Sequence, residues 1–521
     1  MVRVCADKTK PRKLLPILVQ SNMIQGTLFE TSITLPELSS HLWEAANILR
    51  GSPVDRTDWK SYILPLLFFK RICDVWDEER QTMIDDYGEH FPDEHRFQIP
   101  EGSHWQDVRE ASSNVGTALQ NALRNIEVAN QKHLYGVFGD AQWTNKEKLS
   151  DQLLKDLIEH FSALNLSNKR VHSHVMGDAY EYLIKKFADT TKNKAGEFYT
   201  PRSVVHLIVD MLDPQEGETV YDPACGTGGM LLAAVTHLRN KGGDARTFFG
   251  KLYGQEKNLT TASIARMNLV LHGVDDYQVM RGDTLENPAF SEDDQLKTFD
   301  VVLANPPYSI KQWNREKFQS DPWQRNFLGT PPQGRADYAF FQHILKSLDA
   351  KTGRCAILFP HGVLFRKEEA EMRKKLIEAD LVECVLGLGA NLFYNSPMEA
   401  CILICCTRKP PKRQGQILFI DAVHEVARVQ GQSFLKPEHQ SRILSAYQSY
   451  SNDPGFATVA TLEEIAAQDY SLSIPLYVRR KTANSQTEDL KTLAEVWADW
   501  EQGSRAFWQE MDALVDMLDS L

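Results

Sequence analysis

The sequence predicts an α/β protein in three parts: a helical N-terminal domain, a sheet domain and a C-terminal helical tail. Residues 31 to about 170 carry apolar side chains at helical spacing, whereas from about residue 172 short β-rich runs alternate with helical runs. This alternation indicates a parallel sheet wound on both faces. A length of 521 residues suits two or three domains. We expect a basic flexible extension over 1–30, the helical domain over 31–170, the sheet domain over 171–485 and the tail over 486–521.

In the helical domain, the stretch LPELSSHLWEAANIL places apolar residues along one stripe: Leu38, Leu42, Ala45, Ala46 and Leu49. WKSYILPLLFFKRICDVWDEE and KLSDQLLKDLIEHFSAL predict two further helices. The histidines are scattered, so we expect surface or packing roles rather than metal ligation for His41, His90, His95, His104 and His160. The pattern predicts a bundle that packs on another part of the chain.

The sheet domain is expected to hold seven strands, in the sequences ETVYDP, FFGKLYGQE, YQVMRGD, FDVVLANPPY, RCAILFP, LVECVLGLG and EACILICCTRK. Helical runs such as GMLLAAVTHLRN and TTASIARMNLVLHG connect them. In doubly wound sheets, ligands bind beyond the carboxyl ends of the strands, near the point where the winding reverses. The candidate functional residues follow those ends.

Composition narrows the classes of function. The net charge of −12 argues against a chain that grips nucleic acid over a broad face by itself. No apolar run reaches the roughly 18 residues of a membrane span. Cys401, Cys405 and Cys406 lie in the apolar run ACILICC, which is typical of a buried strand and not of a metal site or a disulfide framework. We expect a cytoplasmic protein with no metal and no membrane contact.

The turn in VYDPACGTGGML is the first candidate site. A strand ends in Asp222, and a turn with Gly226, Gly228 and Gly229 leads into a helix, so the backbone can approach a ligand closely. A dinucleotide site is the alternative, but the spacing is not G-x-G-x-x-G. A carboxylate would also repel a pyrophosphate, whereas it suits a ligand with an ammonium and a sulfonium group.

Two further acidic residues end the next strands. Glu256 closes YGQE about thirty residues later, where a carboxylate can hold ribose hydroxyls. Asp283 in RGDTL is placed to meet the amino group of an adenine. The segment GTPPQGRAD has the glycine spacing of a P-loop, but it carries Arg335 for lysine and follows no strand, so we reject that interpretation. Together with the glycine turn, the acids predict an S-adenosylmethionine pocket.

The fourth strand ends in Asn305-Pro306-Pro307-Tyr308. A simple turn would explain this end if it stood alone. The residue before a proline is held extended, which leaves the Asn305 side-chain oxygen and the Pro306 carbonyl as fixed acceptors for the two hydrogens of an exocyclic amine. Tyr308 offers a ring on which a planar base stacks. Beside a methyl donor, such an end predicts methyl transfer to the amine.

DPACGTGG followed by NPPY resembles the amino-directed DNA methyltransferases. KNKAGEFYTPRSVVHLIVDML and AYEYLIKKFA are similar to their type I restriction–modification members, specifically the modification (M) subunit, and the likeness spans roughly residues 30–485. GEFYTP carries Glu197 where the family often has Gln. The resemblance implies that the target adenine is held by Asn305 to Tyr308. It also implies cofactor contacts from Glu197, Phe198, Tyr199, Thr200, Pro201, Arg202, Ala224, Thr227, Gly228, Gly229 and Glu256.

The resemblance implies the methylation subunit of a type I complex, which transfers the methyl group of S-adenosylmethionine to the N6 amino group of a flipped adenine in double-stranded DNA. Asparagine at 305 favours adenine N6 over cytosine N4. Sequence recognition would belong to a separate specificity (S) subunit, with two M chains per S subunit, and a restriction (R) subunit would join the full complex.

The sequence of the tail indicates, independently of the family resemblance, that the chain binds a partner. A heptad seam with alternating spacings of three and four runs along the tail and is interrupted once, at Gly503-Ser504: Leu490, Leu493, Trp497, Trp500, Ser504, Phe507, Met511, Leu514 and Leu518. Residues 484–521 contain nine Asp or Glu against two Lys or Arg, a net charge of −7. The helix would either fold back on its own domain or dock on the basic coiled-coil spacer of the specificity subunit, and we favour docking.

Two loops carry basic residues. The long segment 312–340 is expected to close over the flipped base or to line DNA, with phosphate contacts from Arg315, Lys317, Arg325 and Arg335. RKPPKRQGQ, over 408–416, is more typical of a solvated connector.

Three other functions fit parts of the pattern. NPPY also serves methyltransferases that modify a glutamine amide, but those lack a large helical domain and an acidic heptad tail. A self-sufficient DNA methyltransferase would need its own recognition domain, for which no segment is long enough. A scaffold with an idle pocket would not need Asp222, the glycine turn and Asn305.

Overall fold

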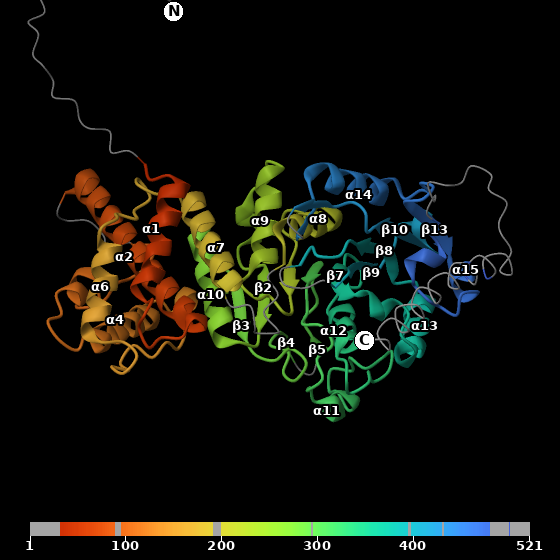
Figure 1. Ribbon diagram of the computed structural model, residues 1–521, viewed down its shortest axis with the longest axis horizontal. Helices are drawn as coiled ribbons and strands as arrows, with labels where there is room; N and C mark the ends of the chain where they lie inside the picture. The colour runs from red at the N-terminus through yellow and green to blue at the C-terminus, as the bar shows by residue number, and fades with distance from the viewer. Residues whose placement is uncertain are drawn as a thin grey trace, which may run out of the picture.

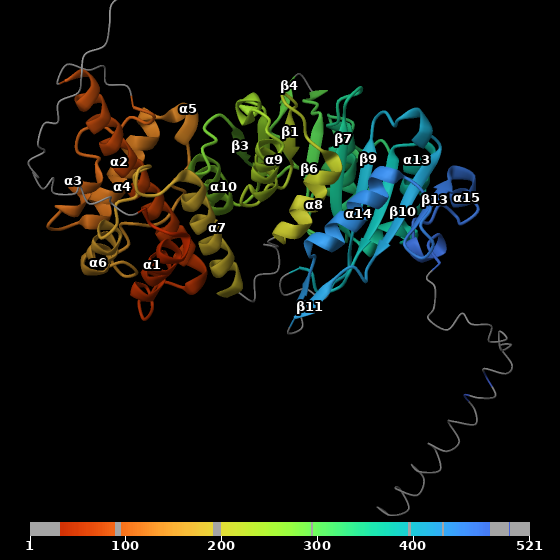
Figure 2. The same ribbon diagram turned by 90° about the horizontal axis from the view of Figure 1, so that it is seen from above.

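The computed structural model describes residues 32–88, 95–190, 200–292, 295–393, 398–429 and 432–479, together with Trp497 and Trp500. The predicted extension over 1–30 and, apart from these two tryptophans, the predicted tail over 486–521 lie outside this set. The helical part occupies one end of an elongated molecule and the sheet part the other (Figures 1 and 2). Within the described residues, no helix is long and apolar enough to cross a membrane.

The N-terminal part is helical, as predicted. Its helices are α1 (Leu35–Ile48), α2 (Trp59–Tyr87), α3 (Trp105–Arg109), α4 (Val115–Ala129), α5 (Gln131–Leu134), α6 (Asp151–Ser162) and α7 (Ser173–Thr190). Thr34 and Glu37 form a capping box at the start of α1, which satisfies N–H groups that have no partner within the helix. The predicted stripe of Leu38, Leu42, Ala45, Ala46 and Leu49 is buried.

The core of this helical part continues into the sheet part. Ile264, Met267, Val270 and Leu271 belong to α10 (Leu259–Leu271), and they share one buried cluster with the N-terminal helices. The prediction of a bundle that packs on another part of the chain is therefore confirmed. Because the apolar faces are shared, the two parts are held together by burial of a common core.

The sheet contains all seven predicted strands and two more. Its order is β13-β10-β8-β9-β7-β6-β1-β2-β3. The strands are β1 (Val220–Asp222), β2 (Leu252–Glu256), β3 (Gln278–Arg281), β6 (Val301–Ala304), β7 (Arg354–Pro360), β8 (Val382–Leu388), β9 (Ala400–Cys406), β10 (Gln416–Ala422) and β13 (Ala457–Thr461). Two short hairpins lie outside it: β4 (Ser291–Glu292) with β5 (Gln295–Leu296), and β11 (Ala427–Val429) with β12 (Gln432–Phe434).

The sheet is mixed, which the prediction of a parallel sheet missed. β9 runs antiparallel to both β7 and β8, and β13 runs antiparallel to β10. β9 is the predicted buried strand ACILICC, and its residues Cys401 and Cys405 are fully buried. An insertion of this strand between two parallel neighbours leaves no trace in the hydrophobic pattern, because strands buried on both faces read as continuous apolar runs in either direction.

Helices cover both faces of the sheet, so the doubly wound fold is confirmed. α8 (Arg202–Leu212), α9 (Gly229–Asn240) and α14 (Pro437–Ser449) share one core with the sheet. α12 (Asp337–Lys346) and α13 (Ala370–Glu378) share the core on the opposite face. Figure 1 shows the two sets above and below the strands. The short helices α11 (Arg315–Gln319) and α15 (Leu462–Ala466) complete the part of the chain that the structure describes.

The winding reverses between β1 and β6. These strands are parallel neighbours, with Val220 opposite Val301 and Tyr221 opposite Val302. After β1 the chain crosses by α9 on one face, and after β6 it crosses by α12 on the other. The two crossings leave a crevice beyond the carboxyl ends of β1 and β6, the position at which such sheets bind ligands. Asp222 is the last residue of β1, and Asn305 directly follows β6.

The long segment after β6 is packed around a buried arginine, which corrects the prediction that Arg325 contacts phosphate. The Arg325 side chain is fully buried. It pairs with the Asp321 carboxylate at 2.6 Å and donates to the carbonyl oxygens of Thr284 and Leu285, each at 2.8 Å. Because those carbonyls follow β3, the arginine ties the segment to the rim of the sheet.

The connector over 408–416 is also more structured than predicted. Lys409 is buried and its Nζ lies 2.6 Å from the Asp380 carboxylate. Arg413 pairs with the buried Glu383 at 2.6 Å. The basic residues of this segment therefore neutralise acids at the base of β8 and are not simply solvated.

Substituting Arg325 by leucine is expected to destabilise the sheet part, because Asp321 would keep a buried charge without its partner. Breaking a buried ion pair costs about 3–5 kcal/mol, which corresponds to a fall in melting temperature on the order of 10 °C. Arg335→Leu is the matched control, since that side chain is 39% exposed and its carboxylate partner Glu368 is exposed. The control should melt within about 2 °C of the wild type. Equal melting temperatures for the two variants in calorimetry would contradict the anchoring role.

Candidate active site

The turn after β1 wraps the backbone closely over β2. Gly226 and Gly228 have φ values of 53° and 80°, a conformation that favours glycine, and α9 begins at the next residue. A Cβ on Gly254 of β2 would lie 2.9 Å from Cys225 Sγ, so only glycine allows this approach. The Asn268 amide donates to the Thr227 carbonyl at 3.0 Å and holds the far side of the turn.

Two carboxylates face each other across this turn. Asp222 is buried and accepts from the Ala224 N–H at 3.0 Å. Glu256 accepts from the N–H groups of Gly226 at 3.2 Å and Asn258 at 2.8 Å. Burial raises the pKa of Asp222 to about 8, and the charge of Glu256 adds to this shift. The pair would repel a phosphate, whereas a cationic ligand would relieve the cost of ionising Asp222.

A cavity of about 1010 Å³ opens at this turn. It lies against α7, α8, α9 and α10 as well as the strand ends. The predicted site residues that line it are Thr200, Arg202, Asp222, Ala224, Gly226, Thr227, Gly229, Glu256, Asn305 and Pro307. The structure thus gathers predicted residues from four separate segments of the sequence around one space.

Other predicted residues are not part of this lining, namely Pro201, Gly228, Asp283, Pro306 and Tyr308. Glu197, Phe198 and Tyr199 lie outside the described residues. The Asp283 carboxylate accepts from the Leu285 N–H at 2.9 Å and pairs with Lys257 at 2.8 Å. Lys257 does line the cavity, so Asp283 stands at its border.

The Asn-Pro-Pro-Tyr end extends β6 towards the cavity. The Asn305 Nδ2 group donates to Thr200 Oγ1 at 2.8 Å, which leaves the Oδ1 atom as the acceptor on the other branch of the amide. Pro307 reaches the same space. Burial raises the pKa of Tyr308, so its ring stays neutral at physiological pH.

A buried network of charged residues supports the chain just after this end, and no sequence motif marks it. Ser309 has a φ of 50°, unusual for a residue other than glycine, and its N–H donates to Asp337 Oδ1 at 2.7 Å. Asp337 is buried at the start of α12 and pairs with Arg366 at 2.7 Å. Glu369 is also fully buried near Arg366, and burial raises its pKa to about 7. The network therefore holds the main chain directly after Tyr308.

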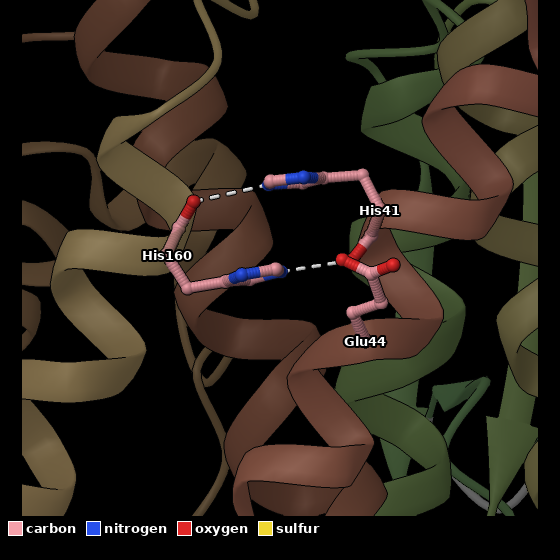
Figure 3. Close-up of side chains that lie close together, drawn as sticks. All are labelled: His41, Glu44 and His160. Carbon is pink, nitrogen blue, oxygen red and sulfur yellow. Dashed lines mark hydrogen bonds between the residues drawn. The ribbon is translucent and has the colours of Figure 1, made fainter.

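A second group of side chains, His41, Glu44 and His160, lies between α1 and α6 (Figure 3). The two imidazole rings are stacked, with centroids 4.0 Å apart and planes within 6°. Each Nε2 is bonded to the main-chain carbonyl of the other histidine, at 3.0 and 2.8 Å. A metal ion lies in the plane of an imidazole that binds it, and two parallel planes cannot share one ion. This geometry favours the packing role predicted for both histidines.

The fold and the cavity together define a class of protein. Paired carboxylates stand beyond two neighbouring strands, and an asparagine-proline end stands across the reversal point from them. This arrangement belongs to methyltransferases that use S-adenosylmethionine and act on an amino group.

Comparisons with known proteins define the family. The model described as N-6 DNA Methylase matches residues 171–486, and the model described as HsdM N-terminal domain matches residues 38–161. The methylase subunit of the type I restriction enzyme MjaVII from Methanocaldococcus jannaschii is 33% identical over 392 residues, which cover 72% of this chain and 65% of that protein. The HindI methylase subunit from Haemophilus influenzae is 32% identical over 413 residues, 73% of this chain and 89% of that protein.

A solved structure gives the same result. The crystal structure of the type I restriction–modification methyltransferase subunit from Streptococcus thermophilus matches with a TM-score of 0.72 and 31% identity, over 86% of this chain and all of that one. The chain therefore belongs to the N-6 DNA methylase family, among the methylase subunits of type I restriction enzymes. It is an S-adenosylmethionine-dependent DNA methyltransferase directed at adenine N6.

Proposed function

We propose that the cavity between Asp222 and Asn305 is where this methylase subunit binds S-adenosylmethionine and methylates a flipped adenine. The observation that carries the proposal is the hydrogen bond from Asn305 to Thr200, because it leaves the amide oxygen of Asn305 as an acceptor at a cavity that Asp222 and Glu256 also line. That oxygen and the Pro306 carbonyl would be the two acceptors for the target amine.

The chemistry of the cavity fits the cofactor. Asp222 would pair with its ammonium group, Glu256 would hold the ribose hydroxyls and Asp283 would meet the adenine amino group. The backbone from Gly226 to Gly229 would lie against it, and Glu197, Phe198, Tyr199, Pro201 and Arg202 would cover its methionine end. When bound, the cofactor supplies an electrophilic methyl group attached to a sulfonium.

Asn305 and the Pro306 carbonyl would orient the target. They accept the two N6 hydrogens, which turns the nitrogen lone pair towards the methyl carbon. The new N–C bond forms as the C–S bond breaks, and one N6 proton passes to water. Neither acceptor needs to be a strong base, because orientation supplies much of the reduction in barrier. Tyr308 would stack on the base, which must leave the duplex at a cost of a few kcal/mol.

Replacing Asn305 by alanine should abolish methyl transfer while leaving cofactor affinity close to that of the wild type. We expect a loss of at least about 100-fold in kcat, because one of the two acceptors is removed. Asp222→Asn serves as the opposite control, since it should weaken the cofactor itself. Calorimetric titration with S-adenosylhomocysteine and single-turnover transfer to DNA measure the two properties. A normal methylation rate in Asn305→Ala would contradict the assigned role.

Cofactor affinity should rise with pH between 6.0 and 7.5. Asp222 has its pKa raised to about 8 by burial, so it is mostly protonated in this window and must ionise to pair with an ammonium group. The ionised fraction changes about tenfold per pH unit below the pKa. Titrations of the wild type should therefore show Kd falling by about tenfold or more across the window. Asp222→Asn should show a flat profile, and a flat profile in the wild type would contradict the pairing.

We also propose that sequence recognition comes from a separate specificity subunit, with two M chains for each S chain and a restriction subunit in the full complex. The net charge of −12 supports a division of labour with a more basic partner. Trp497 and Trp500 are each 63% exposed, with ring centroids 5.3 Å apart. Exposed tryptophans on an acidic heptad pattern suit docking on the helices of such a partner.

Deleting residues 486–521 should then prevent assembly with the specificity subunit and spare the cofactor site. The expected result is loss of the partner in co-purification, with S-adenosylhomocysteine affinity within about twofold of the full chain. Alanine at both Trp497 and Trp500 should weaken assembly in the full-length chain. Unchanged recovery of the specificity subunit with the shortened chain would rule out docking through the tail.

A further inference from the structure

Thr200 and Asn305 come from distant parts of the chain and meet at one hydrogen bond. The amide Nδ2 of Asn305 donates to Thr200 Oγ1 at 2.8 Å across a separation of 105 residues. Both side chains line the cavity. Among the described residues, Thr200 is the hydrogen-bond partner of the Asn305 side chain.

The orientation of the Asn305 amide decides whether it can receive an amine. An asparagine amide has an oxygen and a nitrogen of similar size on its two branches, and rotation by half a turn exchanges them. With Oδ1 towards the substrate, the amide accepts an N6 hydrogen. With Nδ2 towards the substrate, a donor would face a donor, and the amine could not be held.

In the structure Thr200 Oγ1 accepts from Nδ2, so the branch that faces away from the threonine is Oδ1. We propose that Thr200 is a positioning residue for methyl transfer, which acts through Asn305 by holding its amide group at this place in the cavity wall. This inference rests on the proposed function, because it assigns to Thr200 a part in holding the target amine.

The backbone around Thr200 suits this role. Thr200 precedes Pro201, and a residue before proline is restricted to extended conformations. The Pro201 carbonyl accepts from the N–H groups of Val204 and Val205 at 2.9 and 3.1 Å, so the start of α8 is firmly formed. Val204 is fully buried in the core beneath the sheet.

The next residue anchors the same corner to the helical part. Arg202 forms an ion pair with Glu181 of α7, and Asp178 lies 3.6 Å from the same guanidinium. Thr200 therefore lies two residues before an ion pair that links α8 to α7, and its side chain lines the same cavity as Asn305.

The resemblance of GEFYTP to its family instead assigns Thr200 to the cofactor. The two roles predict different measurements. A cofactor contact would raise the Kd of S-adenosylhomocysteine when lost, and saturating cofactor would restore the rate. A positioning residue would lower kcat at saturating cofactor and leave that Kd unchanged.

The test uses the full chain assembled with its specificity subunit and compares Thr200→Val with Thr200→Ser. Valine keeps the branched shape without the hydroxyl, whereas serine keeps the hydroxyl. We expect Thr200→Val to lower kcat by about 10- to 50-fold. Its S-adenosylhomocysteine Kd should stay within about twofold of the wild type, and Thr200→Ser should keep kcat within about threefold. In the Asn305→Ala background, Thr200→Val should cause no further loss, because the two residues act as one unit.

A wild-type kcat in Thr200→Val, or a raised Kd with kcat restored at saturation, would overturn the inference. If wild-type protein yields N6-methyladenine, those results leave the proposed function standing. If the wild type binds cofactor and methylates no adenine, the proposed function and this inference fail together. Should the valine variant not fold, Thr200→Ala answers the same question: a lowered kcat with unchanged Kd supports the positioning role, and a wild-type kcat contradicts it.

Discussion

The reversal of winding between β1 and β6 is the constraint on which the rest of the site depends. Because α9 and α12 leave from neighbouring strands towards opposite faces, the space beyond the carboxyl ends of β1 and β6 opens into the cavity. Asp222 ends one strand and Asn305 follows the other. The Asp222 carboxylate, which favours a cationic ligand, and the Asn305 amide oxygen, which can accept a hydrogen bond from an amine, therefore lie at one crevice. The methyl donor and the methyl acceptor can then be neighbours in that cavity.

Packing outside the crevice keeps its walls in place. The helical part shares a buried core with α10, and Arg202 links the start of α8 to Glu181 of α7. On the other side, Arg325 holds the long segment after β6 against the rim of the sheet, and Asp337 holds Ser309 by its N–H. The contacts of Arg325 and Asp337 are buried ion pairs and charge-assisted hydrogen bonds, which are costly to break singly and therefore fix position more than they add stability. The Arg202 side chain is 51% exposed, so its ion pair contributes less.

Much of this arrangement could be predicted from the sequence, because the motifs are local. Three kinds of motif each predict where a strand ends and which kind of ligand group binds there. They are the glycine turn after Asp222, the acids at the ends of the next two strands, and the Asn-Pro-Pro-Tyr sequence. The fold class followed from the alternation of strands and helices. What could not be predicted depends on contacts between distant residues. The burial of Arg325, the insertion of β9 between β7 and β8, and the bond between Thr200 and Asn305 have no local pattern, since arginine, apolar runs and threonine are equally common elsewhere.

The most direct test of the account is the identity of the methylated nucleoside. The chain, with and without its specificity subunit, would be incubated with labelled S-adenosylmethionine and plasmid DNA, and the DNA digested and analysed by mass spectrometry. The account predicts labelled N6-methyladenine, formed only when the partner is present. Labelled N4-methylcytosine, or no methylated nucleoside in either sample although the chain binds cofactor, would contradict it.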